Sequence, residues 1–448
     1  MFGKVIRLKK IKFSEFKNIK SSSIEIENDV MKSVTGIYGA NGSGKTAVID
    51  AIDVLKQNMT GKVAEFPYYY INVDASKSKL TYFLSYTDFQ KRDFDIEYTL
   101  EYVKNDRSIS FSKENFKIYN DNFSFKFVIN RNAKNIKKAI LVNDSEFDDG
   151  MFDIDELTKM FYVNVSNSSS IVFGGIGKCL RAKYEWLNNI LLDFNRYAEF
   201  QMFVIKMRET SLISASDKIY FHVSVQDENY VTVGTQVCNL LGTSEITKNN
   251  LPVFKQAIEQ CNEILSVIIP DFRIVLFEIP GVVMNSQNEE CVNVSFFSMR
   301  SENNEPLPLV FESEGIKKII SIVSSLISCY NNTSTLVAID EFDAGIYEYL
   351  LGQLIQTISL GGKGQLIFTS HNLRVLEVID VNSIVFSTLN PKNRFVKFRN
   401  CKPTNNLRSL YIRALQLGGQ KEEFYIPMDS VDLKIAFKQA NIIGKKEQ

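Results

Sequence analysis

Hydrophobic and polar residues alternate along much of the first third of the chain. Between about residues 80 and 130, apolar residues occupy every second position with polar residues between them, as in the runs 94–102 and 123–129. A period of two with one polar face predicts antiparallel strands that pack on one side only. We expect the Phe and Tyr side chains of these strands to form core rather than a surface on which bases stack.

Shorter patterns flank this β-rich stretch. Residues 4–27 predict two strands around a turn, and Val34–Tyr38 predicts a third strand that we expect in the same sheet. Thr46–Leu55 predicts a helix that follows this third strand almost directly. The N-terminal part of the chain therefore predicts mainly strands, with one early helix.

Continuous apolar runs replace the alternation in the second half of the chain. Thr335–Ile339 and Gln365–Thr369 each predict a strand buried on both faces, which is typical of a parallel sheet. We also expect helices over about 184–213 and 251–268, a helix that opens at 311–315, and a tail helix that includes 407–415. Two more strands are expected over 273–279 and 292–297.

These patterns predict an α/β fold class with a mixed sheet and an antiparallel β layer. Helix-breaking residues at 164–177 mark a boundary between two lobes. We therefore expect four segments, of which the second makes an arm or a surface for a partner. They are an N-terminal lobe over 1–165, a mainly helical insertion over 166–270, a C-terminal lobe over 271–400 and a helical tail over 401–448.

Composition limits the classes of function. The 448 residues are 45% hydrophobic and 23% charged, which suits a globular protein with a large core. Lys and Arg number 52 and Asp and Glu number 52, so the net charge gives no case for nucleic acid. Basic runs at 4–20 and 131–138 keep contact with DNA as an alternative. Without a transmembrane run or a signal-peptide pattern, we expect a cytoplasmic protein with no membrane contact.

Histidine and cysteine usage excludes several kinds of chemistry. The chain has two histidines, His222 and His371, and six scattered cysteines without a Cys-x-x-Cys pair. Zinc hydrolases, His-dependent metal nucleases and Ser-His-Asp hydrolases need more histidine or a different arrangement of it. The cysteine spacing argues against a structural zinc site and against a disulfide framework.

Residues 39–46, Gly-Ala-Asn-Gly-Ser-Gly-Lys-Thr, match the phosphate-binding P-loop. Its glycines allow successive backbone N–H groups to point at phosphate oxygens, and the helix that follows directs its N-terminus at the same anion. Lys45 supplies positive charge for the β- and γ-phosphates, and the Thr46 hydroxyl is a ligand for Mg²⁺. The residues expected to bind nucleotide here are Gly39, Asn41, Gly42, Ser43, Gly44, Lys45 and Thr46.

Polar residues follow both of the predicted buried strands. Asp340 ends the first strand and is expected to hold Mg²⁺ together with Thr46. Glu341 comes next and can orient and deprotonate the water that attacks a γ-phosphate. His371 follows the second strand and can donate a hydrogen bond to that phosphate. Each feature alone is common at a strand end, but together they predict one site with Glu341, His371 and Lys45 as its catalytic residues.

Several motifs resemble those of ABC ATPases. Ser313–Lys317 resembles a divergent ABC signature motif, Asp340–Gly345 resembles Walker B with the catalytic glutamate and the D-loop, and Thr369–Asn372 resembles the switch histidine region. Phe13–Ile19, followed by the P-loop, is similar to the SMC-like branch. The tail phrases at 406–408 and 417–420 resemble the OLD-like ATPase subunits of prokaryotic anti-phage systems of the PARIS or Septu type. The resemblance covers roughly residues 1–60 and 305–425.

This resemblance implies an ABC-type P-loop ATPase head, interrupted by the insertion, that uses ATP and Mg²⁺. It also implies that two copies enclose two nucleotides, each bound by the P-loop, Walker B and switch histidine of one copy and the signature helix of the other. Ser313, Gly315 and Asp343 are then expected to bind nucleotide as well. The implied assembly is a homodimer or a higher homo-oligomer.

Three functions fit these expectations. The first is an anti-phage defence ATPase that acts as sensor and scaffold and controls a separate effector protein. We expect that effector to be a nuclease, because too few residues follow His371 for a Toprim domain on this chain. The second is an SMC-like DNA repair or recombination ATPase that binds DNA directly, although no long coiled coil is present. The third is a scaffold that barely hydrolyses nucleotide, against which Glu341 argues. We expect the first.

Two features of ABC ATPases are not found in the sequence. No glutamine is a convincing Q-loop residue, since Gln90 lies in a β context. No aromatic residue can be assigned to stack on adenine.

Overall fold

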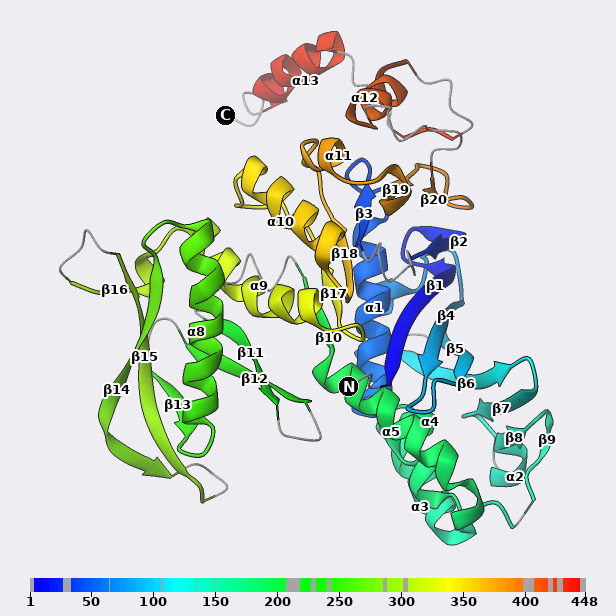
Figure 1. Ribbon diagram of the computed structural model, residues 1–448. Coiled ribbons are helices and arrows are strands. Elements are labelled where there is room, and N and C mark those ends of the chain that lie inside the picture. Colours follow the sequence, from blue (N-terminus) through cyan, green and yellow to red (C-terminus); the bar gives the residue numbers. More distant parts are fainter. Residues whose placement is uncertain are drawn as a thin grey trace.

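Two sheets with a helix between them form the part of the molecule that carries the P-loop (Figure 1). The helix is α1 (Lys45–Met59), and a separate group of strands surrounds helix α8 (Leu251–Ile268). The computed structural model describes residues 4–26, 34–63, 65–105, 108–133, 135–148, 150–206, 218–226, 231–239, 243–284, 288–300, 305–397, 407–417, 422–424 and 430–443.

The first sheet is antiparallel and has eight strands in the order β2-β1-β4-β5-β6-β7-β8-β9. Tyr98, Phe116 and Phe127 on its inner face are completely buried, as the alternation predicts. The prediction of antiparallel strands whose aromatic residues form core is confirmed. The strands are β1 (Val5–Phe16), β2 (Ile19–Glu25), β4 (Lys77–Thr87), β5 (Asp93–Lys104), β6 (Ile109–Asn120), β7 (Phe123–Asn130), β8 (Ile140–Val142) and β9 (Ser145–Glu146).

The second sheet has six strands in the order β10-β17-β18-β3-β19-β20. The first five are parallel and β20 is antiparallel to β19. Both predicted buried strands are present, since every residue of β17 and β18 is buried. The strands are β10 (Met202–Ile205), β17 (Leu336–Ile339), β18 (Gln365–Thr369), β3 (Val34–Tyr38), β19 (Ile384–Ser387) and β20 (Phe395–Val396).

Residues of the parallel sheet alternate between two cores, which explains the continuous apolar runs. Leu336 and Ala338 pack with α1, the antiparallel sheet and helix α5 (Glu185–Phe200). Val337 and Ile339 belong to the core on the opposite face, to which several other helices contribute. They include α9 (Glu314–Asn331), α10 (Glu348–Gly361) and α12 (Leu407–Leu417). The predicted α/β fold with a mixed sheet and an antiparallel layer is confirmed.

The expectation that the first three strands share one sheet is wrong. β1 and β2 belong to the antiparallel sheet, whereas β3 lies between β18 and β19 in the parallel sheet. The burial of the strands explains the difference. All five residues of β3 are buried, as a central parallel strand requires, whereas only Ile19 and Ile24 are buried in β2.

The segment 166–270 contains strands that the helical pattern did not predict. The helix expected to reach residue 213 ends at Phe200, because Met202–Ile205 is a short apolar run that pairs with β17 as the edge of the parallel sheet. Three strands lie where the insertion was expected to be mainly helical, namely β11 (Lys218–Gln226), β12 (Val231–Asn239) and β13 (Ser244–Thr247). The division into four segments remains a prediction.

A second β unit follows in the chain. β13, β15 (Glu290–Met299) and β14 (Arg273–Met284) form a sheet that β16 (Leu307–Pro308) joins through β15. No helix within the described ranges is long and apolar enough to cross a membrane. The remaining elements are α2 (Ile136–Ala139), α3 (Ile154–Ser166), α4 (Ile171–Gly174), α11 (Val375–Val378), α13 (Ser430–Ile443) and the 3₁₀ turns at 68–70, 176–179, 182–184, 309–311 and 381–383.

Candidate functional site

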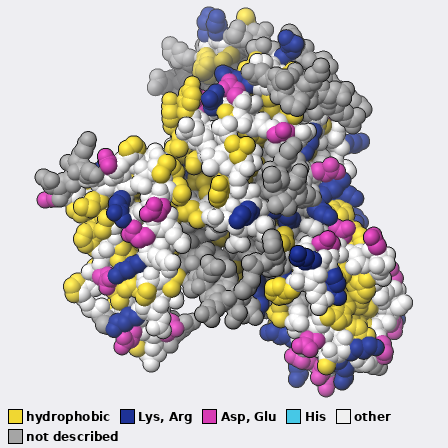
Figure 2. All heavy atoms as spheres, in the orientation of Figure 1, with side chains coloured by type: hydrophobic (Ala, Val, Ile, Leu, Met, Phe, Trp, Pro, Cys, Tyr) yellow, Lys and Arg dark blue, Asp and Glu magenta, His cyan; other side chains and the backbone are white. Residues whose placement is uncertain are grey.

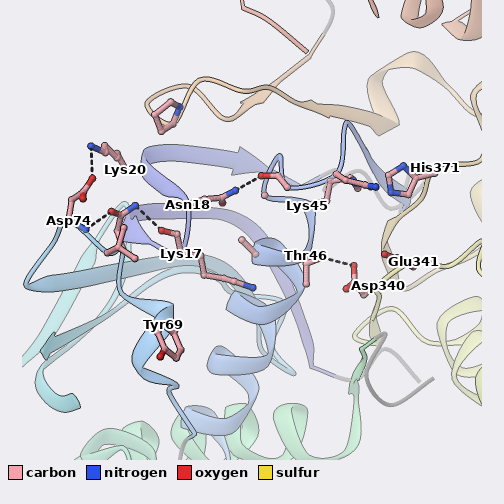
Figure 3. A pocket seen from close by; sticks show the side chains of 17 residues that line it. Lys17, Asn18, Lys20, Lys45, Thr46, Tyr69, Asp74, Asp340, Glu341 and His371 are labelled. Atoms are coloured by element: carbon pink, nitrogen blue, oxygen red, sulfur yellow. Dashed lines mark hydrogen bonds and ion pairs between the residues drawn. The ribbon is translucent and has the colours of Figure 1, made fainter. Parts of the chain in front are cut away.

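The predicted catalytic and metal-binding residues meet at one cleft of about 700 Å³. Lys45 and Thr46 enter it from the start of α1, Asp340 and Glu341 from the end of β17, and His371 from just beyond β18 (Figure 3). β3, β18 and β17 are neighbours in the parallel sheet, so their carboxyl ends bring together segments that are far apart in sequence. Asn41, Gly42 and Gly44 also line the cleft.

The P-loop depends on glycine at two positions. A Cβ on Gly39 would lie 2.0 Å from the Oγ atom of Ser387 on β19, so no side chain fits there. Gly44 begins α1 with a left-handed φ of 94°, which glycine adopts without strain. Ser43 is buried beneath the loop, where its hydroxyl contacts that of Ser387 and donates to the carbonyl of Ala40.

Lys45 lies folded along the inside of the loop. Its Nζ donates to the carbonyl oxygens of Gly39 and Ala40 at 2.9 and 3.0 Å. Burial lowers the pKa of Lys45, while the nearby carboxylates of Asp340 and Glu341 oppose that shift. A phosphate could accept from the same ammonium group in place of these carbonyls.

Thr46 and Asp340 offer oxygen atoms suited to Mg²⁺. The Thr46 hydroxyl donates to Oδ1 of Asp340 at 3.3 Å, so the hydroxyl and the carboxylate already face one another. The Thr369 hydroxyl donates to the same Oδ1 at 2.6 Å and fixes the carboxylate. Among the described residues, no three His, Cys, Asp or Glu side chains gather as a metal site. The pair therefore fits a Mg²⁺ ion that takes its other ligands from phosphates and water.

Glu341 has an unusual backbone conformation, with a φ of 47°. This left-handed conformation is uncommon for a residue with a side chain. Two groups hold it, because the Glu341 N–H donates to the Thr369 hydroxyl at 2.7 Å and Nζ of Lys318 donates to its carbonyl at 2.6 Å. Burial lowers the pKa of Lys318 to about 8, although Asp343 and Glu341 counteract part of that shift.

His371 is attached to the D-loop through its backbone. Its N–H donates to Oδ2 of Asp343 at 3.0 Å. Burial and the positive charge of Lys45 lower the pKa of His371, so its imidazole is neutral at pH 7. A neutral imidazole can still donate one hydrogen bond to a phosphate oxygen. Asp343 itself does not line the cleft.

Ser313 and Gly315 do not line this cleft either. Ser313 is exposed and caps the N-terminus of α9, where its hydroxyl accepts from the Ile316 N–H. Gly315 lies against the D-loop so closely that a Cβ on it would be 2.3 Å from the carbonyl oxygen of Gly345. The structure therefore places the signature residues beside the D-loop of the same chain and outside its own P-loop cleft.

The segment that leaves β10 begins close to the site. β10 lies next to β17, so the segment that leaves β10 starts beside Asp340. Its first residue is Lys206, whose Nζ pairs with the carboxylates of Asp50 and Asp53 on α1. Residues 207–217 lie outside the described part of the chain.

Several basic side chains near the N-terminus make ion pairs or hydrogen bonds within the protein itself. Lys9 pairs with Asp95, Lys17 with the buried Asp50, and Arg7 is buried among backbone carbonyls. Arg131 of the second basic run is also buried. Figure 2 shows basic and acidic side chains intermixed on the visible face. These observations do not favour DNA contact at either run.

Comparison with known proteins gives a family match and several similar folds. The model of the family described as "AAA domain, putative AbiEii toxin, Type IV TA system" matches residues 34–164 and 215–377. None of the curated proteins matches the chain.

Three similar solved structures are an Smc head, a second Smc head and a recombination mediator. The Smc head bound to the C-winged helix domain of ScpA is 14% identical, with 87% of this chain and 97% of that chain covered and a TM-score of 0.42. The SMC head domain from Thermotoga maritima is 15% identical, with 88% and 99% covered and a TM-score of 0.39. RecF of the RecFOR pathway is 12% identical, with 88% and 98% covered and a TM-score of 0.38.

Proposed function

The chain belongs to the AAA-domain family of AbiEii-type proteins, and on that premise we propose that it binds and hydrolyses ATP with the help of Mg²⁺. Its fold is that of an ABC-type P-loop ATPase. One observation carries the proposal, namely the convergence of Lys45, Thr46, Asp340, Glu341 and His371 on a single cleft. These residues come from three adjacent strand ends, and each has a role in phosphoryl transfer that its chemistry supports.

The roles follow from the contacts. Lys45 and the P-loop N–H groups bind the β- and γ-phosphates, and Thr46 and Asp340 hold Mg²⁺, which supplies positive charge to the phosphates when bound. Glu341 accepts a hydrogen bond from the attacking water and orients it toward the γ-phosphate. The neutral imidazole of His371 donates to the same phosphate.

A second copy of the chain completes the site. Ser313 and Gly315 stand outside the cleft of their own chain, at an exposed helix N-terminus that can receive the γ-phosphate of a nucleotide on another copy. The ATP-bound state is then a homodimer or higher homo-oligomer, and hydrolysis separates the heads.

The biological role that we propose is anti-phage defence. The protein acts as sensor and scaffold of a prokaryotic system and controls a separate effector, a nuclease. The family description supports this assignment, since it names an AbiEii toxin and a type IV toxin–antitoxin system. The internal pairing of the basic residues is the reason for placing direct DNA binding second.

The test compares wild-type protein with Glu341→Gln and Lys45→Ala, purified together with the proteins encoded beside it. We expect ATP and Mg²⁺ to double the molar mass of the wild type in light scattering, and phosphate to be released. Glu341→Gln should lower turnover by about 100-fold or more and lock the dimer, because only the orientation of water is lost. Lys45→Ala should abolish both dimer formation and turnover.

The matched control is Glu348→Gln, which changes an exposed glutamate on α10 and should leave turnover and mass unchanged. A neighbouring protein that stays bound to the locked dimer would support effector control. A protein that stays monomeric with ATP, retains no partner and binds duplex DNA with strong salt dependence would overturn the defence proposal in favour of DNA repair.

A further inference from the structure

The cleft extends well beyond the groups that would hold a triphosphate. Its outer half is lined by Lys20, Val73, Asp74 and Pro391, which come from β2, from the loop before β4 and from the turn between β19 and β20. Figure 3 shows Lys20 and Asp74 at the end of the view opposite His371, with the P-loop between them. This inference rests on the proposed function. If the phosphates occupy the P-loop, the nucleoside has to lie in this outer half.

The outer half is fixed by the protein before any ligand arrives. The buried Asn72 side chain donates to the carbonyl of Lys17 at 2.8 Å and accepts from the N–H of Asp74 at 3.1 Å. The N–H groups of Lys20 and Ser21 both donate to the carbonyl of Pro391, at 2.8 and 3.2 Å. All three segments are therefore joined to one another through the start of β2 and the turn that precedes it.

The same turn also holds the P-loop. The Asn18 side chain donates to the carbonyl of Gly42, and Lys17 has a left-handed φ of 52°. Left-handed backbone at a residue with a side chain costs free energy and recurs where ligands are bound. The outer half and the phosphate end are consequently parts of one rigid binding surface.

The side chains of the outer half combine an apolar contact with a donor and an acceptor. Val73 is 81% exposed, so its apolar side chain is available for contact with a ligand in the cleft. Nζ of Lys20 lies 3.4 Å from Oδ2 of Asp74. That leaves Oδ1 of Asp74 as an acceptor beside the ammonium donor of Lys20.

We propose that Lys20 and Asp74 read the Watson–Crick edge of adenine, with the ring against Val73 and Pro391. Adenine carries a donor, the N6 amino group, next to an acceptor, N1, and Oδ1 of Asp74 and the ammonium of Lys20 match them in that order. Guanine bound in the same orientation presents the reverse order, with the acceptor O6 at the position of N6 and the donor N1–H at the position of N1. Oδ1 of Asp74 would then face O6 and the ammonium of Lys20 would face N1–H, so neither contact forms a hydrogen bond. The pair therefore selects ATP over GTP.

The experiment measures nucleotide affinity by calorimetry in the Glu341→Gln background, which prevents turnover. The probes are ATP, GTP and purine riboside triphosphate, which lacks the N6 amino group. We expect ATP to bind about tenfold more tightly than purine riboside triphosphate, the low end for a hydrogen bond to a charged group at an open site. Asp74→Ala should remove this difference by weakening ATP alone, and Lys20→Met should weaken both purines.

Asp144→Ala is the matched control, because Asp144 also pairs with a lysine, Lys126, on the polar face of the antiparallel sheet. It should change no affinity. Equal affinity for ATP and purine riboside triphosphate, or tighter binding of GTP, would overturn the inference.

Lys45→Ala separates this inference from the proposed function. If Lys45→Ala abolishes binding of ATP and tripolyphosphate while the base makes no difference, only the reading of the base is wrong. If Lys45→Ala leaves ATP binding intact, the nucleotide does not use this cleft and the proposed function fails as well.

Discussion

At the scale of single residues, the backbone of Glu341 is the most informative feature of the site. Its φ of 47° costs roughly 1–2 kcal/mol for a residue with a Cβ. The cost is offset by a hydrogen bond on each side of the residue, to Thr369 and from Lys318. In the proposed reaction Lys318 is therefore a positioning residue, which would act on the attacking water only through Glu341.

Lys318→Met should lower kcat by about tenfold with little change in KM, since about 1.4 kcal/mol of positioning is lost and no contact with nucleotide changes.

The same change should raise the melting temperature at pH 7. Burial lowers the pKa of Lys318 to about 8, so the folded protein bears the cost of a buried charge below pH 8. The gain should shrink as the pH rises from 8 toward 10.5, where the wild-type side chain loses its proton.

Lys317→Met is the control for this prediction. Lys317 is the preceding residue of α9, is equally buried and pairs with Glu314 rather than with the site. Steady-state kinetics and thermal unfolding of both variants check the prediction. Equal losses of kcat in the two variants would show that α9 is merely perturbed.

The sequence predicts the residues of the site that belong to local motifs. Lys45, Asp340, Glu341 and His371 were found because each stands at a fixed distance from a glycine or an apolar strand, and the structure brings all four together. Lys318 gives no such signal, since its contact with Glu341 depends on how α9 packs against β17. The same is true of Asn72, whose role depends on two other segments of chain.

At the scale of elements, the breaker-rich stretch near residue 170 is firmly attached to the antiparallel sheet. Glu114, which is completely buried on β6, accepts from the hydroxyl of Tyr98 at 2.7 Å and from the N–H of Ile171 at 2.8 Å. Arg131 donates to the carbonyls of Ser169 and Asn164, both at 2.7 Å. Glu114 and Arg131 therefore provide hydrogen-bond partners for backbone N–H and carbonyl groups in the stretch where the helical pattern stops.

Glu114→Gln should lower the free energy of unfolding by about 2–3 kcal/mol, because a neutral amide replaces a buried carboxylate that accepts several hydrogen bonds. Urea unfolding followed by circular dichroism measures the change. Asp121→Asn, at an exposed turn between β6 and β7, is the control and should change the free energy by less than about 0.5 kcal/mol. Similar values for the two variants would mean that the buried carboxylate adds nothing to stability.

Element types were predictable where one period dominates and were not where two periods meet. The alternation over β4–β7 and the apolar runs of β17 and β18 define their strands without any tertiary information. The strand β10 was missed because it directly follows α5, and its four apolar residues extend the helical pattern of α5. Only the pairing of β10 with β17 identifies it as a strand. The sheet to which β3 belongs could not be predicted from local sequence, because its partners β18 and β19 come much later in the chain.

At the scale of the whole molecule, the two sheets are joined through the start of β1. Arg7, only 4% exposed, donates to the carbonyls of Thr333 and Lys363 at 3.0 and 2.8 Å. The N–H and carbonyl of Leu8 bond to the side chain of Gln365, at 2.9 Å each. These contacts connect the antiparallel sheet to the loops that lead into β17 and β18.

Because of these contacts, the two sheets should unfold together in calorimetry. Arg7→Met should lower the free energy of unfolding by about 3 kcal/mol, since two backbone carbonyls lose a charged donor. Arg92→Met, which removes the exposed arginine of a pair with Asp88, is the control and should have a much smaller effect. Two separate transitions in the wild type would contradict the close connection of the sheets.

The position of β3 in its sheet has a consequence for the synthesis of the protein. β3 is made early, but its partners β18 and β19 leave the ribosome only after almost the whole remaining chain has been translated. At about 5–20 residues per second, an apolar strand with two open edges waits for roughly tens of seconds. The nascent chain therefore needs protection from aggregation during that interval. The P-loop, among the first motifs to be translated, is one of the last to become able to bind a ligand.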